Sequence, residues 1–252
     1  MHHVLITGAG SGIGAGIAAH LAQAGHHVLA SDLDLGAAQA VAADINAAGG
    51  SAQALALDVT SEASITQALA GLSRGPDVLV NNAGLQHVAP LEAFPMERWE
   101  LLVEVMLTGV ARLTRAVLPG MRERGFGRIV NIGSIHSLVA SPYKSAYVAA
   151  KHGLVGFAKV VALETAAHDI TINTLCPSYV KTPLVDRQIA DQARARGMAE
   201  DEVIAKVMLA PMPKGRFIEY DELAGAIGFL ASAAARNITG QVLAIDGGWT
   251  VQ

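Results

Sequence analysis

The chain has 252 residues, of which 52% are hydrophobic and 16% charged, and its formal net charge is −4. These values are typical of one globular α/β protein with a large core, and they exclude the strongly basic surface that binds nucleic acid or an acidic membrane. The single cysteine, Cys176, excludes an internal disulfide framework and favours the reducing cytoplasm. We expect neither a signal peptide nor a membrane span, because the sequence has no signal-peptide pattern and no run of 18 apolar residues.

Short apolar runs alternate along the chain with longer, alanine-rich stretches. The apolar runs predict strands at residues 4–7, 27–31, 54–57, 78–81, 128–132, 171–176 and 242–245. The stretches between them predict helices near residues 12–24, 36–48, 61–72, 96–123, 144–167 and 220–232. Continuously apolar strands joined by helices are typical of a parallel sheet that is covered on both faces. Because such crossovers are right-handed, we expect an α/β fold with a doubly wound (Rossmann) sheet of about seven strands in a single domain, 1–252.

The segment 183–214 interrupts this alternation. It contains Pro183 and Pro211 and is rich in charged residues of both signs. We interpret it as a helical lid over the mouth of the site rather than as a separate domain. The alternative is a solvated surface insertion.

The first predicted strand runs into a glycine-rich turn and a helix in "VLITGAGSGIGAGIAAHL", residues 4–21. Its glycines allow the backbone to turn tightly and to approach a pyrophosphate, whose charge then faces the helix N-terminus. A glycine triplet is a weak signal by itself, but between a strand and a helix it predicts a dinucleotide site. The residues that we expect to line this site are Thr7, Gly8, Ser11, Gly12, Ile13 and Gly14.

The second predicted strand ends at Asp32, in "VLASDLD". A carboxylate at this place can accept hydrogen bonds from the ribose hydroxyls and repels a 2′-phosphate. No lysine or arginine occurs before Arg74, so a 2′-phosphate would lack a local cationic partner, and we expect NAD rather than NADP. The alternative is that Asp32 caps the helix that follows it.

The next two predicted strands are followed by residues that we expect beside the adenosine half of the dinucleotide. Asp58 and Val59 come after the third strand and would flank the adenine. The stretch "NNAGLQH", residues 81–87, ends the fourth strand, and it would place Asn82, Ala83 and Gly84 against the adenosine ribose.

Tyr147 and Lys151 form a candidate reactive group, because residues four apart share one face of a helix. A free phenol has a pKa of about 10, and a nearby ammonium favours the phenolate, so we expect Lys151 to lower the pKa of Tyr147. Ser134, at the end of the fifth strand, could hold a carbonyl oxygen while Tyr147 donates a proton and a nicotinamide delivers hydride. Lys151 would also bind a ribose of the dinucleotide, so Tyr147 and Lys151 belong to the expected cofactor site as well. Each residue is commonplace alone, but together with the glycine-rich turn they predict an oxidoreductase active site.

Across its whole length the chain resembles the short-chain dehydrogenase/reductase family. The resemblance lies in TGAGSGIG, NNAG, Ser134 with YVAAK, and the segment after Cys176-Pro177. Within that family, "SIHSLVASPYKSAYVAAKHGLVGF", "TPLVDRQI" and "ITGQVLAIDGGWT" are most similar to bacterial (R)-3-hydroxybutyrate dehydrogenases. The resemblance implies NAD-dependent oxidation of 3-hydroxybutyrate to acetoacetate by a homotetramer, and we assign no residue to a metal.

The same resemblance implies roles for residues outside the reactive group. Pro177, Val180 and Thr182 match the stretch that contacts the nicotinamide carboxamide and a phosphate. The residues that would surround the substrate carboxylate are Gln86, His136, Lys144 and Gln188, with Trp249 closing the pocket from the same chain or from a neighbouring subunit. A four-carbon acid offers little apolar surface, so charge-assisted hydrogen bonds to its carboxylate must supply much of the binding energy.

These substrate residues also have structural interpretations. Lys144 could be a solvated charge at a helix entry, and His136 a residue of a surface loop. Gln86 and Gln188 are unremarkable polar residues when taken singly. A tryptophan near the end of a chain, such as Trp249, is often a packing residue.

Two positions depart from the family pattern. Met106 stands where the family has an asparagine that helps to hold a water linked to the active-site lysine, and a thioether is only a weak acceptor. We expect the backbone carbonyl of Met106 to hold that water instead. Ser178 stands where glycine is common, in "CPSYVKTPL".

The sequence leaves two other functions open. One is a related NAD-dependent oxidoreductase that acts on another short hydroxy acid, a polyol or a 3-oxoacyl thioester. The acidic, cation-free stretch before Arg74 argues against the carrier-protein reductases that prefer NADPH. The other is a dinucleotide-binding regulator without catalysis, and the intact Ser134, Tyr147 and Lys151 argue against it.

Overall fold

Seven parallel strands form one sheet in the computed structural model, which describes residues 1–251 apart from the side chains of residues 184, 191, 192 and 195. The strands are β1 (His3–Thr7), β2 (His27–Asp32), β3 (Ser51–Ala56), β4 (Val78–Asn81), β5 (Phe126–Ile132), β6 (Asp169–Pro177) and β7 (Val242–Ile245). Their order is β3-β2-β1-β4-β5-β6-β7. The order reverses between β1 and β4, so the carboxyl ends of these two strands open the crevice in which such sheets bind ligands.

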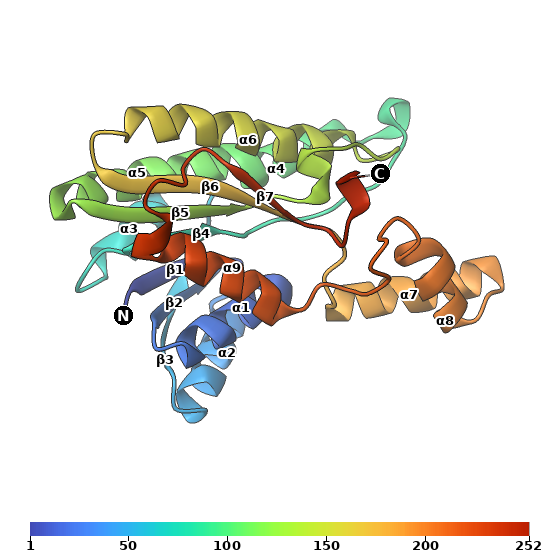
Figure 1. Ribbon diagram of the computed structural model, residues 1–252, viewed down its shortest axis with the longest axis horizontal. Coiled ribbons are helices and arrows are strands. Elements are labelled where there is room, and N and C mark those ends of the chain that lie inside the picture. Colours follow the sequence, from blue (N-terminus) through green and yellow to red (C-terminus); the bar gives the residue numbers. More distant parts are fainter. Residues whose placement is uncertain (252) are drawn as a thin grey trace.

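Helices cover both faces of the sheet. Figure 1 shows α4, α5 and α6 above it and α1, α2 and α9 below it. The helices are α1 (Gly12–Gln23), α2 (Leu35–Ala47), α3 (Glu62–Ala70), α4 (Met96–Val103), α5 (Gly109–Arg124), α6 (Ser145–Glu164), α7 (Pro183–Arg196), α8 (Glu200–Val203) and α9 (Tyr220–Ala231). Short helical turns are η1 (Leu91–Ala93), η2 (Glu104–Thr108), η3 (Ile135–Ser137), η4 (Ile204–Met208), η5 (Ala233–Ala235) and η6 (Trp249–Val251).

Successive residues of the strands fill cores on opposite faces of the sheet. In β1, Val4 and Ile6 pack in one cluster with Ile17 of α1 and Ile227 of α9. Leu5, which lies between them in sequence, packs on the other face with side chains of α5 and α6. Because both faces are covered at β1, its residues are apolar in succession, and runs of this kind made the strands recognisable in the sequence.

The predicted doubly wound sheet is confirmed, several predicted boundaries are wrong by one to three residues, and one predicted helix is interrupted. The strand predicted at 54–57 begins at Ser51, because the ladder with β2 pairs Ser51 with His27 and extends beyond the apolar run. The helix predicted at 96–123 is interrupted, since the π-helical turn η2 separates α4 from α5. Single π-helical turns inside helices are often found at functional sites.

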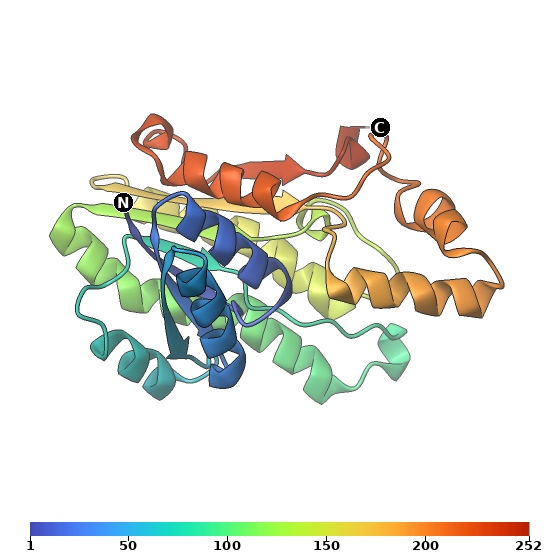
Figure 2. The ribbon, with the colours of Figure 1, turned by 90° about the horizontal axis from the view of Figure 1, so that it is seen from below.

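The lid segment, residues 183–214, is helical as predicted and comprises α7, α8 and η4. Buried apolar side chains give it a small core of its own, made by Val185, Ile189, Ala193, Val203 and Met208. Figures 1 and 2 both show α7 and α8 projecting beyond the sheet. The backbone on its two sides meets in a parallel bridge between Val180 and Ile218.

By length and composition alone, α6 is apolar enough to cross a membrane. The helix packs against β6 and α4, and its buried residues include Ala146, Ala150 and Leu154. These buried residues are therefore those of a helix that covers the sheet, while Val160 and Leu163 of the same helix are exposed. Two lysines, Lys151 and Lys159, interrupt the apolar residues of this helix.

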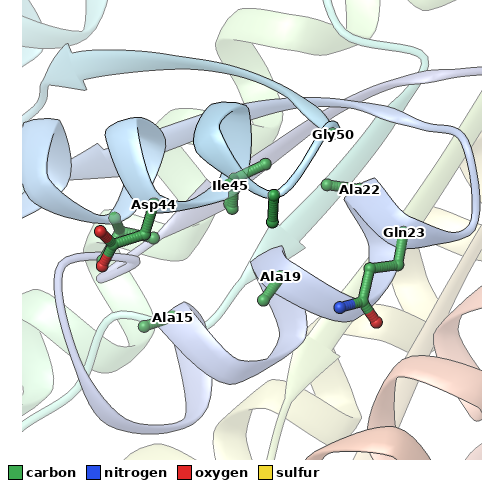
Figure 3. Close-up of a pocket in the computed structure, with 9 residues that line it drawn as sticks. Ala15, Ala19, Ala22, Gln23, Asp44, Ile45 and Gly50 are labelled. Atoms are coloured by element: carbon green, nitrogen blue, oxygen red, sulfur yellow. The ribbon is translucent and has the colours of Figure 1, made fainter.

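A groove lies between α1 and α2, as Figure 3 shows. Small side chains such as Ala15, Ala19 and Ala22 line it from α1, and Ile45 lines it from α2. Its lining is mostly apolar, with one carboxylate at Asp44. We assign no chemistry to this groove.

Histidines gather at the amino ends of β1 and β2. The ring of His2 stacks on His26 with 5.5 Å between centroids and on Phe126 with 5.2 Å, and the Arg128 guanidinium lies 4.3 Å from the Phe126 ring centroid. Burial, and then the charges of nearby cationic groups, lowers the pKa of His2 and of His26 from 6.5. Both rings are therefore neutral at neutral pH.

We expect the free energy of unfolding to fall as the pH drops below about 6.5, because the unfolded chain then binds protons that the stacked histidines do not bind. The expected loss is small, since solvent screens these half-buried rings. Urea titrations at the two pH values measure the loss, and the double variant His2→Gln, His26→Gln should reduce it. An equal loss in the variant would contradict the assignment.

Candidate active site

The carboxyl ends of β1 and β4 are joined by side-chain hydrogen bonds. The Thr7 hydroxyl oxygen accepts from the backbone N–H groups of Asn82 and Ala83, both at 3.0 Å. The amide of Asn82 donates to the carbonyl oxygens of Thr7 at 2.9 Å and of Gly8 at 3.2 Å. These bonds hold the glycine-rich turn and the segment after β4 together at the crevice.

The glycine-rich turn leaves room for an anionic group at the start of α1. Gly8 and Gly12 have positive φ angles of 65° and 54°, and a Cβ on Gly14 would lie 2.2 Å from the carbonyl oxygen of Gly8. Beside Gly12, the position of a Cβ has no heavy atom of the described chain within 4 Å. The N-cap residue Ser11 makes no side-chain capping bond among the described residues, so the first N–H groups of α1 remain available to a phosphate. The turn therefore fits the pyrophosphate of a dinucleotide, with the half-buried Ile13 packed beneath it.

Asp32 lies against the glycine-rich turn and does not cap α2. Its Oδ2 accepts from the backbone N–H of Gly10 at 2.9 Å, and its Oδ1 accepts from the N–H of Asp34 at 3.0 Å. The cap of α2 is Asp34, whose carboxylate accepts from the N–H of Ala37. The alternative in which Asp32 caps the helix is thus wrong. Gly10 is a residue that the sequence analysis missed, since a Cβ there would lie 2.8 Å from the Asp32 carboxylate.

The residues expected near the adenine have local structural contacts. Asp58 Oδ1 accepts from the backbone N–H of Thr60 at 2.8 Å and from its hydroxyl at 2.7 Å. Val59 is buried beside the start of α5, where a Cβ on Gly109 would lie 2.9 Å from its Cγ2. Gly84 is exposed after β4. Both Asp58 and Val59 therefore shape the loop after β3, whatever else they contact.

Ser134, Tyr147 and Lys151 come together where β5 ends and α6 begins. The Ser134 side chain lies near enough to the Tyr147 hydroxyl to lower the pKa of that phenol, against the effect of burial. The Lys151 ammonium lies 5.7 Å from the centroid of the Tyr147 ring and donates to the carbonyl oxygen of Ile132 at 2.6 Å. Ser134 is itself held by Ser137, whose hydroxyl oxygen accepts from the Ser134 N–H at 3.2 Å. Ser137 was not predicted, although its position three residues after Ser134 is that of a capping box.

The expectation that the pKa of Tyr147 is lowered is wrong for the chain without a bound dinucleotide. Burial of the hydroxyl raises the pKa of Tyr147, and the hydrogen bond with Ser134 offsets only part of that rise. Burial also lowers the pKa of Lys151 to about 8. The lysine ammonium is directed to the Ile132 carbonyl, and loss of hydration dominates at the phenol. Tyr147 is therefore a neutral proton donor at neutral pH.

A second cluster lies beside the first and contains His136 and Lys144. The Lys144 Nζ lies 3.2 Å from the His136 Nε2, and the His136 ring lies 6.1 Å, edge to face, from the ring of Tyr147. Burial, together with the Lys144 charge, lowers the pKa of His136 to about 4, so its neutral ring accepts the hydrogen bond that the lysine donates. His136 is only 6% exposed, and burial also lowers the pKa of Lys144. Neither residue is the solvated surface group of the alternative interpretation.

Trp249 reaches this cluster from its own chain. Its ring centroid lies 6.5 Å from that of His136 and 5.8 Å from that of Tyr179. Gln86 is exposed after β4 and Gln188 is half-buried on α7, and in the described part of the chain neither forms a hydrogen bond with the cluster. The structure therefore brings Trp249, His136 and Lys144 together without the two glutamines.

The segment after β6 leads from the sheet to the lid segment. Pro177 ends β6, Val180 forms the bridge to Ile218, and the Thr182 hydroxyl oxygen accepts from the N–H of Val185 to cap α7. Ser178, which stands where glycine is common in the family, donates from its hydroxyl to the sulfur of Met212 at 3.3 Å. The departure at Ser178 thus joins this segment to the end of the lid segment.

A family model described as short chain dehydrogenase matches residues 2–193. The chain belongs to this family. A D-beta-hydroxybutyrate dehydrogenase of Cupriavidus necator is 44% identical to it, over 98% of this chain and 97% of the relative. Among solved structures, an actinorhodin polyketide ketoreductase with NADPH has a TM-score of 0.91 and 34% identity, covering 98% of this chain and 96% of that one. A putative NAD(P)-dependent gluconate 5-dehydrogenase of Beutenbergia cavernae, with bound NADP, has a TM-score of 0.88 and 37% identity, covering 99% and 97%.

The protein is therefore an oxidoreductase of the short-chain dehydrogenase family that uses a nicotinamide dinucleotide. Family membership and the seven-stranded parallel sheet agree with the expected fold. The start of α1, where the N-cap residue Ser11 makes no side-chain capping bond among the described residues, fits such a cofactor.

Met106 lies in the π-helical turn η2 and is buried. It packs in an apolar cluster with Leu102, Ala146 and Ala150, and a Cβ on Gly84 would lie 3.5 Å from its sulfur. In place of the family asparagine the chain therefore has an apolar side chain, which packs in a hydrophobic cluster that Tyr147 also contacts. A proton path from Lys151 past this position cannot use a side-chain amide.

We expect Met106→Asn to change kcat by less than about tenfold. The reason is that the backbone carbonyl of residue 106, which we expect to hold the water linked to Lys151, is present whatever the side chain. The same change should lower the free energy of unfolding by about 1–3 kcal/mol, since it places an amide in an apolar cluster. Steady-state kinetics and urea titration measure the two effects, with Met106→Leu as the apolar control. A rise in kcat far above tenfold would mean that the proton path is broken in the parent.

Proposed function

We propose that the protein interconverts (R)-3-hydroxybutyrate and acetoacetate, with NAD as its dinucleotide. The observation that carries this proposal is the pair formed by the half-buried Lys144 and the buried His136, which lies beside the Tyr147 ring. A carboxylate there would accept a charge-assisted hydrogen bond from the Lys144 ammonium. The reacting carbon of a short hydroxy acid would then lie next to the Tyr147 hydroxyl. The 44% identity to a D-beta-hydroxybutyrate dehydrogenase supports the same substrate.

The residues of the reactive group have separate roles in this proposal. In the reduction of acetoacetate, the neutral Tyr147 hydroxyl donates its proton to the carbonyl oxygen, which the Ser134 hydroxyl holds by a hydrogen bond. In the oxidation, the Tyr147 oxygen accepts the proton of the alcohol as a phenolate, which the adjacent Lys151 charge stabilises. Because burial raises the pKa of Tyr147, oxidation should accelerate as the pH rises. The bound dinucleotide accepts or supplies the hydride.

The preference for NAD over NADP rests on Asp32. Its carboxylate lies at the end of β2, against the glycine-rich turn, where it would meet the ribose hydroxyls and repel a 2′-phosphate. No lysine or arginine precedes Arg74 in the sequence. The two solved relatives described above carry NADPH and NADP, so the cofactor is a property to be measured for this chain.

We further propose that Gln86 and Gln188 join the carboxylate site, that Pro177, Val180 and Thr182 border the nicotinamide, and that 1–252 acts as one domain. The protein would work as a homotetramer in the cytoplasm. Exposed apolar side chains support association, and they include Val160 and Leu163 on α6, Phe229 on α9 and Leu243 on β7. Light scattering of the purified protein tests the tetramer.

The absorbance of NADH and NADPH tests the function and the cofactor together. The substrates are (R)-3-hydroxybutyrate, its S enantiomer, gluconate and, in the reverse direction, a 3-oxoacyl thioester. Turnover confined to the R acid with NAD supports the proposal. Faster turnover of gluconate would favour the activity named for the Beutenbergia cavernae relative. Faster turnover of the thioester would favour the alternative oxidoreductase, and binding of dinucleotide without any turnover would favour a regulator.

A further inference from the structure

The last turn of the described chain is built around one carboxylate. Asp246 is 8% exposed, and its carboxylate accepts from the N–H of Gly248 at 2.9 Å, from the N–H of Thr250 at 2.9 Å and from the Thr250 hydroxyl at 2.6 Å. Burial raises the pKa of Asp246, but the hydrogen bonds from Thr250 and Gly248 outweigh it and hold the pKa below its usual value. The group is therefore ionised at neutral pH and closes the turn that contains Trp249.

The turn is also attached to the end of the lid segment. Gly247 and Gly248 have φ angles of 62° and 93°, in the region that favours glycine. The carbonyl oxygen of Gly247 accepts from the N–H of Lys214 at 3.0 Å, and a Cβ on Gly247 would lie 3.1 Å from the Met212 methyl carbon. The turn thus has one defined conformation, fixed at Asp246 and at Lys214.

This conformation decides where the indole of Trp249 lies. The backbone N–H of Trp249 donates to the carbonyl oxygen of Asp246 at 3.2 Å, so the two residues are held within a single turn. The indole packs on His136 and Tyr179, and His136 receives the hydrogen bond from Lys144. Side-chain contacts therefore run without a gap from the Asp246 turn to the proposed carboxylate site.

We propose that Asp246 is a positioning residue that fixes Trp249 against His136 and so determines how tightly the site holds a short hydroxy acid. The inference rests on the proposed function for the class of substrate. The position of the Trp249 indole is inferred independently of the proposed function. Asp246 itself touches none of the reactive residues, so its loss should act on KM far more than on kcat.

The position of Trp249 can be measured without any substrate. The chain has two tryptophans, so Trp99→Phe leaves Trp249 as the one fluorescent indole. In this background, Asp246→Asn should about double the acrylamide quenching of Trp249, because the amide loses acceptors for at least one of the three hydrogen bonds. Asp221→Asn, an exposed carboxylate on α9, is the matched control and should leave the quenching unchanged.

The kinetic measurement uses the same variants in the otherwise parent chain. Asp246→Asn should raise KM for the acid that the parent oxidises by about tenfold and change kcat by less than about threefold. Thr250→Val, which removes only the hydroxyl bond, should have a smaller effect in the same direction. It is the deciding variant if Asp246→Asn does not fold.

Two results would overturn the proposal. Quenching of Trp249 equal to that of the parent in a folded variant shows that Asp246 does not position the indole, whatever the substrate is. Altered quenching with an unchanged KM shows that the indole does not affect substrate binding. If hydroxybutyrate is not turned over at all by the parent, the proposed function fails, and the quenching result still decides the positioning role.

Discussion

Tyr147→Phe is expected to lower kcat by about 10³-fold in both directions, because it removes the group that donates and accepts the proton. The change deletes one oxygen and keeps the ring that packs against His136, so the site should keep its shape. The affinity for the dinucleotide should remain within about twofold of that of the parent, since the loss of the proton-transferring hydroxyl acts on the chemical step and not on binding. Steady-state kinetics and a dinucleotide titration of the same preparation measure both quantities.

Tyr220→Phe is the matched control for this experiment. It deletes the same hydroxyl from a tyrosine whose ring lies against Gly16, between α9 and α1, and it should leave kcat unchanged. The parent should also oxidise faster as the pH rises, because burial raises the pKa of Tyr147 and oxidation needs the phenolate. A Tyr147→Phe protein with the rate of the parent would remove the phenol from the mechanism.

Lys144→Ala should raise KM for the hydroxy acid by about 30- to 100-fold, the value of a charge-assisted hydrogen bond at a half-buried site. The expected change in kcat is less than about threefold, because Lys144 binds the end of the substrate that does not react. Lys144→Arg keeps the charge and the donors, and it should recover part of the affinity. Dinucleotide affinity should not change in either variant.

The pH dependence of KM gives a second test of Lys144. Burial lowers the pKa of the ammonium from 10.5, and the charge that binds a carboxylate is lost as the pH rises through that lowered pKa. KM of the parent should therefore rise at alkaline pH, whereas KM of Lys144→Ala should be flat over the same range. A KM that is equal in parent and variant at neutral pH would identify Lys144 as a surface charge.

The sheet could be predicted from sequence because its central strands, such as β1 and β4, are buried on both faces. Residues such as Val4, Leu5 and Ile6 are apolar in succession and buried. Several such runs, separated by helices, are typical of a parallel sheet that is covered on both faces. The start of β3 could not be predicted in this way, since Ser51 enters the ladder through backbone bonds that do not depend on its side chain. The interruption of the long helix at Met106 was likewise not predicted, because Gly109, which stands directly after the π-helical turn, is compatible with a continuous helix.

Sequence spacing predicted which groups of the site would meet, but not how they would be solvated. Tyr147 and Lys151 are near each other as the four-residue spacing requires. The pKa of Tyr147 nevertheless moves upward, because the hydroxyl loses more hydration than the lysine charge returns. Hydration depends on the packing of several distant elements, and this information is absent from a motif. The hydrogen bond from the Gly10 N–H to Asp32 was also missed, because it depends on how the glycine-rich turn packs against the end of β2.

The lid segment offers a route to new substrates within this scaffold. Its buried residues, such as Ile189 and Val203, contact one another, and its two ends meet at the Val180–Ile218 bridge. Apart from Leu209 and Met212, which pack in the main core, the segment is folded around its own interior and enters and leaves at one place, so it can be exchanged as a cassette. Recognition could therefore diversify through recombination of this cassette, while the hydride-transfer machinery on β5 and α6 is inherited intact.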